Sequence, residues 1–198
     1  TDLLVNYTYR IAFEGGGGQD FGLAAAIAAG TAPVNGCPVG GAPVADKIAA
    51  IMGVESGSSE KKVAFVKCKG TCDKTNVKYN YYGITDCSMV TVAPGSGEKA
   101  CAYGCMGYGS CVKACQFDAI HVVDGVAVVD KEKCVACGKC VATCPKDLIE
   151  LVPYKAEHLV QCSSHDKGPA VKKVCTAGCI GCTLCTKQCE FDAIHMEN

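Results

Sequence analysis

Three dense groups of cysteine carry the chemistry that this chain could perform. The chain has 18 cysteines among 198 residues, and the middle group reads Cys134-x2-Cys137-x2-Cys140-x3-Cys144-Pro145. This C-x2-C-x2-C-x3-C-P spacing is typical of loops that hold cubane iron–sulfur clusters through cysteine thiolates. The other two groups comprise Cys101, Cys105, Cys111 and Cys115, and Cys175, Cys179, Cys182, Cys185 and Cys189. We therefore expect a protein that transfers electrons.

The spacing also assigns ligands to two clusters. When two such groups pair, the fourth cysteine of each ligates the cluster that the other group holds. The first cluster is then predicted to be bound by Cys115, Cys134, Cys137 and Cys140. In the first group Tyr108 stands where a cysteine is expected, so the second predicted set is Cys101, Cys105, Cys111 and Cys144. The fourth cysteine of each group is expected to begin a short helix.

The third group provides part of a further site. Cys179, Cys182 and Cys185 supply three sulfurs, and Cys189 would serve a cluster whose other ligands follow Asn198. The heptads that begin at Cys115 and at Cys189 are nearly identical, and the stretch from Cys144 to Glu150 is a weaker copy. One unit is thus repeated. Because such units normally work in pairs, we expect the natural protein to continue past residue 198.

Six cysteines remain outside these assignments: Cys37, Cys68, Cys72, Cys87, Cys162 and Cys175. One hypothesis is a further metal site made by Cys68, Cys72 and Cys87 with Cys162 or Cys175. The alternative is that several of them are buried thiols, which are common in protein cores.

Zinc is the alternative metal for the dense groups, because four-cysteine zinc sites also use C-x2-C pairs. A single tetrahedral ion requires two separated pairs, whereas exchange of the fourth cysteine accounts for all four positions of the middle group. The sequence therefore favours iron–sulfur clusters over zinc.

Composition argues against several other functions. The 19 basic and 20 acidic residues nearly cancel, and no run of Lys or Arg suggests a nucleic-acid partner. No apolar stretch is long enough to span a bilayer directly. No signal peptide is visible, and reduced cysteines suit the cytoplasm. No nucleophile–base pair or cofactor loop is visible, so no substrate-transforming site is predicted in this chain.

The predicted fold is α+β. It comprises a two-[4Fe–4S] ferredoxin-like module, a second, incomplete ferredoxin-like repeat and a small N-terminal helical segment. Five segments are expected: an N-terminal stretch of unclear or misread sequence (1–20), a small helical domain with an incomplete cluster motif (21–60), a strand with a cysteine-containing loop insertion (61–100), the two-cluster domain (101–152), and a connector with the first half of the second repeat (153–198). Helices are expected at 21–29 and 44–52, and strands at 5–13, 63–66, 119–123, 126–129 and 148–152. The Asp124-Gly125 pair between two of these strands predicts a hairpin with a type I′ turn.

With these motifs in view, the chain resembles the B subunits of Rnf complexes, in their clostridial and acetogen forms. The resemblance is carried by Ala24–Gly41, Val66–Cys87, Ala100–Ile120, Cys134–Val152 and Val160–Ile194. It implies a subunit with at least two [4Fe–4S] clusters, and three or more are expected. Such a subunit accepts electrons from soluble ferredoxin and passes them into a membrane-bound ferredoxin:NAD+ oxidoreductase that pumps Na+ or H+. It implies a place at the cytoplasmic face of the cell membrane, among the other subunits of the redox complex.

One departure from the family concerns its N-terminal cluster motif. Cys37-Pro38 matches the end of that motif, but Ala12, Gly15 and Asp20 stand where its other three cysteines are expected. Cys37 is therefore only a weak candidate ligand. The alternative functions are a ferredoxin-like subunit of another redox enzyme, such as a 2-oxoacid oxidoreductase, and a zinc-stapled interaction protein. A plain ferredoxin subunit would lack the stretches 24–41 and 66–87.

Overall fold

The N-terminal part of the fold is a pair of helices. The computed structural model describes residues 21–37, 39–57, 60–92, 95–191 and 193–196, so the segment 1–20 and the strand predicted at 5–13 lie outside the described residues. Helix α2 (Phe21–Ala28) is followed by Gly30, and α3 (Gly41–Met52) by Gly53. Both glycines are left-handed, with φ of 73° and 68°, a conformation that ends helices and suits glycine. Both predicted helices are confirmed.

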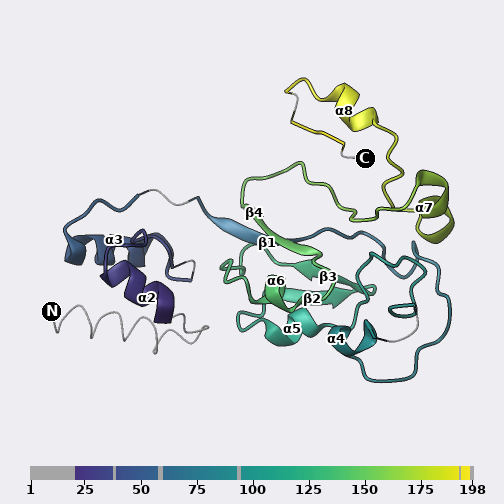
Figure 1. Cartoon of the computed structure of the whole chain (residues 1–198), viewed down its shortest axis with the longest axis horizontal. Helices are drawn as coiled ribbons and strands as arrows, with labels where there is room; N and C mark the ends of the chain where they lie inside the picture. The colour runs from purple at the N-terminus through teal and green to yellow at the C-terminus, as the bar shows by residue number, and fades with distance from the viewer. Residues whose placement is uncertain (1–20, 38, 58–59, 93–94, 192, 197–198) are drawn as a thin grey trace.

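The central part of the fold repeats a strand–helix–strand order. The order is β1 (Lys62–Val66), α5 (Ser110–Ala114), β2 (Ile120–Val123), β3 (Val126–Val129), α6 (Lys139–Thr143) and β4 (Ile149–Pro153). Strands β1 and β4 pair antiparallel, with Val63 opposite Val152. Strands β2 and β3 form the predicted hairpin, and its turn residues Asp124 and Gly125 have φ of 48° and 76°. Figure 1 shows α5 and α6 next to each other, below β1 and β4 in this view.

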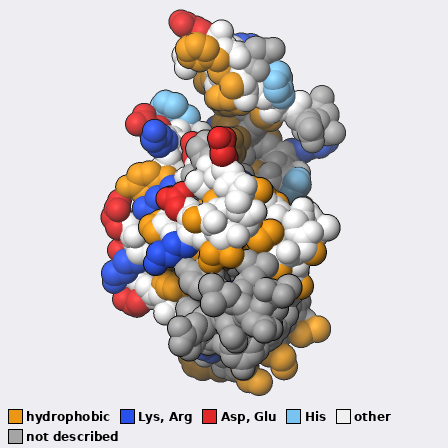
Figure 2. Space-filling model, turned by 90° about the vertical axis from the view of Figure 1, so that its left-hand side faces the viewer, with side chains coloured by type: hydrophobic (Ala, Val, Ile, Leu, Met, Phe, Trp, Pro, Cys, Tyr) orange, Lys and Arg blue, Asp and Glu red, His pale blue; other side chains and the backbone are white. Residues whose placement is uncertain are grey.

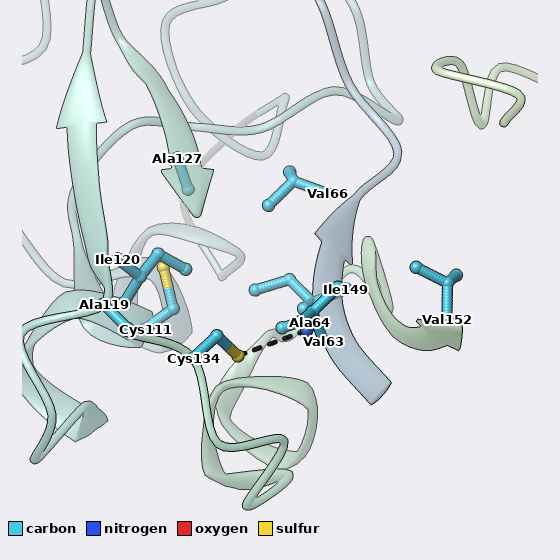
Figure 3. Close-up of a cluster of buried hydrophobic side chains, with 10 residues drawn as sticks. All are labelled: Val63, Ala64, Val66, Cys111, Ala119, Ile120, Ala127, Cys134, Ile149 and Val152. Carbon is cyan, nitrogen blue, oxygen red and sulfur yellow. Dashed lines mark hydrogen bonds between the residues drawn. The ribbon is translucent and has the colours of Figure 1, made fainter. Parts of the chain in front are cut away.

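The main hydrophobic core lies among these elements and includes cysteines. Val63 and Ala64 of β1, Ile120 of β2 and Ile149 of β4 are buried together with Cys111 and Cys134 (Figure 3). Strand β1, which was predicted at 63–66 as part of the segment 61–100, packs on the same core as residues of 101–152. The chain therefore builds its cysteine loops directly against the core.

Three further short helices complete the described elements: α4 (Cys87–Val90), α7 (Gly168–Val174) and α8 (Leu184–Gln188). The end of α7 docks on the segment after β1, where Asn76 N–H donates to Val174 O at 3.0 Å and Thr176 N–H donates to Lys74 O at 2.8 Å. Helix α8 lies near the C-terminal end of the described chain (Figure 1). Within the ranges described above, no helix has the length and apolar character needed to cross a membrane.

Candidate metal centres

The three cysteine groups share one local conformation. In each group the next-to-last cysteine lies in a short helix: Cys111 in α5, Cys140 in α6 and Cys185 in α8. The residue before each helix is left-handed, with φ of 73° at Gly109, 77° at Gly138 and 60° at Thr183. The shared conformation supports the view that one unit occurs three times in the chain.

The last cysteine of each group ends the helix rather than beginning it. Cys115, Cys144 and Cys189 each occupy the C-cap position in an extended conformation. The expectation that this cysteine starts a helix is therefore wrong. An extended residue at the helix end turns the chain away from its own loop, which lets the last sulfur reach a neighbouring site.

The first cavity is surrounded by the four cysteines predicted for the first cluster. Cys115 from the end of α5 and Cys134, Cys137 and Cys140 from the next group line it. Ala64 N–H of β1 donates to Cys134 Sγ at 3.3 Å (Figure 3), and Ala119 N–H donates to Cys115 Sγ at 3.5 Å. Burial, reinforced by the neighbouring thiols, raises the pKa of Cys140 to about 11.

The second cavity is lined by Cys87, Cys105, Cys111 and Cys144, with apolar side chains such as Val66 and Ile149 around them. Burial, with further effects from the thiols of Cys105, Cys87 and Cys144, raises the pKa of Cys111 to about 12. Three of these four cysteines were predicted for the second cluster. The structure lines this cavity with Cys87 and not with Cys101, so here its geometry differs from the expectation.

Cys87 reaches the second cavity through hydrogen bonds that hold α4 against α5. Cys87 N–H donates to Ser110 Oγ at 2.8 Å, and the Ser110 hydroxyl donates to Asp86 Oδ2 at 3.1 Å. Ser110 is 5% exposed and Cys87 is 9% exposed. Sequence reasoning placed Cys87 in a hypothetical further metal site with Cys68 and Cys72, and not at this cavity, because Cys87 lies outside the dense groups. Its nearest sequence signal was Tyr108, which marks the missing cysteine without saying what replaces it.

A third cavity is lined by cysteines from four separate parts of the chain: Cys68, Cys101, Cys162 and Cys175. Cys105 lines this cavity as well as the second one. Of the other weak candidates, Cys72 is exposed and Cys37 is half-buried. Neither of those two lines any of the three cavities.

The third cysteine group is more open. Cys179, Cys182 and Cys185 are exposed, and Cys189 is half-buried. Ala193 N–H donates to Cys189 Sγ at 3.4 Å. Backbone N–H groups of Ala193 and Phe191 lower the pKa of the Cys189 thiol. This repeats the hydrogen bond from the Ala119 N–H to Cys115 Sγ, so the end of the third group has the same local geometry as the end of the first.

The donors at the first and second cavities are cysteine thiols. Within the described ranges, no group of three or more His, Cys, Asp or Glu side chains is gathered closely enough to hold one metal ion. A tetrahedral zinc ion would draw its thiolates to within about 4 Å of one another. A cubane instead places one thiolate on each of four irons, so its ligands surround a cavity, and N–H donors to sulfur tune it. The residues at the first and second cavities fit this group.

Comparison with known proteins points to the same chemistry. The family described as the LdpA Fe-S cluster-binding domain matches residues 110–155. That range contains both short helices α5 and α6 and the cysteines from Cys111 to Cys144.

Three relatives match most of the chain, and each is named as the B subunit of an ion-translocating oxidoreductase complex. The chain is 50% identical over 177 residues to that of the Na+-translocating ferredoxin:NAD+ oxidoreductase complex of Acetobacterium woodii, a match that covers 89% of this chain and 53% of that protein. It is 44% identical to that of the ion-translocating oxidoreductase complex of Methanosarcina acetivorans, over 87% of this chain and 66% of that protein. It is 41% identical to the B subunit of the proton-translocating ferredoxin:NAD+ oxidoreductase complex of Clostridium ljungdahlii, over 84% of this chain and 58% of that protein. The chain thus spans about half to two thirds of the length of these relatives.

A short local match is of another kind. A stretch of 28 residues, 14% of this chain, is 96% identical to the maltose/maltodextrin transport system permease protein MalF of Klebsiella aerogenes and covers 5% of that protein. A match of this length is too small a part of the permease to indicate its fold or activity. It leaves the likeness over 167 to 177 residues unchanged.

Proposed function

Because the chain belongs to the family of B subunits of ion-translocating oxidoreductase complexes, we propose that it is an electron-transfer subunit of such a complex. It accepts electrons from reduced ferredoxin and passes them toward a membrane-bound ferredoxin:NAD+ oxidoreductase, at the cytoplasmic face of the membrane. Relatives are named for Na+ and for proton translocation, and the proposal covers either ion.

One observation carries this proposal: four cysteines from two segments surround the first cavity. Cys115 comes from the end of α5, Cys134 and Cys137 come from the loop that leads into α6, and Cys140 comes from α6 itself. A [4Fe–4S] cluster bound there supplies one-electron transfer without breaking a substrate bond. With a second cluster in the second cavity, the repeated strand–helix–strand order becomes a two-cluster ferredoxin-like domain.

The chain's own residues set the conditions for that electron transfer. Thiolates hold each site, and N–H groups such as those of Ala64 and Ala119 offset negative charge on sulfur. Val63, Ile120 and Ala127 are at most 3% exposed, so they exclude water from the space between the cysteine loops. Hydrogen bonds to sulfur and exclusion of water are the means by which a protein tunes such sites.

The surface suits transient protein partners. The formal net charge is −1, and Figure 2 shows acidic and basic side chains interspersed on the face in view. Docking of ferredoxin would therefore use local complementarity and not a large field of one sign. The open third group offers three sulfurs of a further site.

The test is iron and acid-labile sulfide analysis of the full-length protein purified without oxygen, with EPR of the reduced form. Replacing Cys137 by alanine should remove about one cluster, or roughly four irons and four sulfides per chain, and interrupt transfer from reduced ferredoxin. The matched control is Cys72→Ala, because Cys72 is exposed and outside the cavities. Unchanged iron and electron throughput in the Cys137 variant would refute the proposal.

A further inference from the structure

We propose that Cys68, Cys101, Cys162 and Cys175 bind a third iron–sulfur cluster, in the third cavity. This inference rests on the proposed function, because it adds a site to the same electron path. Neither the spacing within the dense groups nor their pairing assigns it. The four cysteines come from the segment after β1, from the first dense group, from the connector and from the end of α7.

Backbone pairing brings these distant cysteines together. Cys68 and Cys162 face each other in an isolated antiparallel bridge, and Cys175 faces Thr75 in another. The Thr75 hydroxyl donates to Cys175 Sγ at 3.6 Å. Two isolated bridges that each place a cysteine at the same cavity are what a site assembled from separate segments requires.

Backbone donors converge on the sulfur of Cys68. Gly70 N–H and Cys105 N–H both donate to Cys68 Sγ, each at 3.4 Å. Such donors stabilise a thiolate ligand and are found around cluster sulfurs. The same sulfur therefore already has the hydrogen-bonding environment that a cluster ligand needs.

Two glycines keep the space between the sulfurs open. A Cβ atom at Gly104 would lie 3.4 Å from Cys101 Sγ and 3.7 Å from Cys68 Sγ. A Cβ atom at Gly70 would lie 3.4 Å from Cys175 Sγ, 3.7 Å from Cys68 Sγ and 2.5 Å from Thr75 Oγ1. Side chains at these two positions would fill the space around which the sulfurs are grouped.

The charged side chains that line the third cavity are positive and favour an anionic ligand. Lys99 lines the cavity and is 7% exposed, and its Nζ donates to the carbonyl oxygens of Gly70 at 3.1 Å and Gly125 at 2.5 Å. Lys67 and Lys69 line the cavity too; Lys67 pairs with Glu150 at 3.1 Å, and among the described residues that line the cavity there is no Asp or Glu. A buried cation is costly without a compensating charge. Four thiolates around an iron–sulfur core would supply that charge.

The same assignment also determines which four cysteines are the ligands at the second cavity. If Cys101 belongs to the third cavity, the fourth place in the second falls to Cys87, which already lines it with Cys105, Cys111 and Cys144. Each of the three cavities then has four cysteine ligands, and no cysteine serves two clusters.

Double variants of the full-length protein test which cysteines share a cluster. Cys101→Ala and Cys162→Ala should each remove about one cluster, and the double variant should lose no more than either single one. Cys101→Ala combined with Cys144→Ala should lose two clusters. The opposite pattern, with two clusters lost in the first pair and one in the second, would overturn the assignment. Cys72→Ala is the control and should keep all its iron.

A measurement on the unaltered protein guards against variants that fail to fold. Cys68 and Cys162 should resist alkylation until iron is removed under native conditions, whereas Cys72 should react at once. Equal labelling of Cys68 and Cys162 before and after iron removal would overturn the proposal. So would stoichiometric zinc, or a Cys68–Cys162 disulfide in the anaerobic protein.

The outcomes separate this inference from the proposed function. Loss of a cluster in the Cys137 variant, with unchanged iron in the Cys162 variant, would reject the third cluster alone. A protein that carries no iron at all would reject both.

Discussion

Replacing Ser110 by alanine should loosen Cys87 from the wall of the second cavity. The Ser110 hydroxyl accepts the N–H of Cys87 and donates to the carboxylate of Asp86. Both Ser110 and Cys87 are buried, so water cannot readily replace the lost partner. An orphaned buried donor costs about 1–3 kcal/mol. In a chain of this size each kcal/mol lowers the melting temperature by roughly 2–4 °C, so a fall of several degrees is expected.

The assay follows thermal bleaching of the visible cluster absorbance, under anaerobic conditions and at a fixed scan rate. Ser88→Ala is the matched control, because Ser88 lies in the same helix α4 but is exposed. The control should bleach at nearly the parent temperature. EPR of the Ser110 variant should show a perturbed second cluster and an unchanged first one. If both variants bleach at the same temperature, Ser110 does not hold Cys87 in the way described.

Three further outcomes are expected. Gly107→Ala should destabilise the protein more than Gly138→Ala. Both residues are left-handed, but a Cβ at Gly107 would lie 2.6 Å from the Gly125 carbonyl oxygen and one at Gly138 meets nothing within 4 Å; equal melting temperatures would contradict this. In iron-free protein, burial raises the pKa of Cys111 from 9.0 to about 12. The contribution of that thiol to the free energy of unfolding is therefore fully present below pH 9 and is lost as the pH rises toward 12. A Cys111→Ala variant should lose less unfolding free energy between these pH values than the parent protein, and an equal loss in both would count against a buried thiol at this position. Iron removal should speed hydrogen exchange at the Ala64 amide, which donates to Cys134 Sγ at 3.3 Å, relative to the β1 amide of Phe65; an unchanged ratio of the two rates would argue against a cluster there.

Features encoded within a few residues could be predicted from the sequence. Gly30 and Gly53 mark helix ends because their left-handed conformation is a local property. Asp124-Gly125 specifies its hairpin turn for the same reason. The grouping of Cys134, Cys137 and Cys140 with Cys115 follows from a spacing rule that needs only one neighbouring loop.

Features that depend on distant packing could not be predicted in this way. Strand β1 carries no sign that its partner is β4, because pairing depends on how the intervening loops fold. Cys87 enters the second cavity through a hydrogen bond to Ser110, which belongs to another element. Cys101 was assigned by its place in a dense group, although the structure sets it beside Cys68 in the third cavity.

The position of Cys105 has a consequence for the route that electrons take. Cys105 lines both the second and the third cavity and therefore lies between them. Tunnelling rates decay exponentially with separation. Clusters bound in the second and third cavities, which both have Cys105 in their lining, would therefore exchange electrons faster than either would with a remote acceptor. A cluster in the third cavity would then be an additional electron carrier, which extends the electron-transfer path without adding a long tunnelling distance.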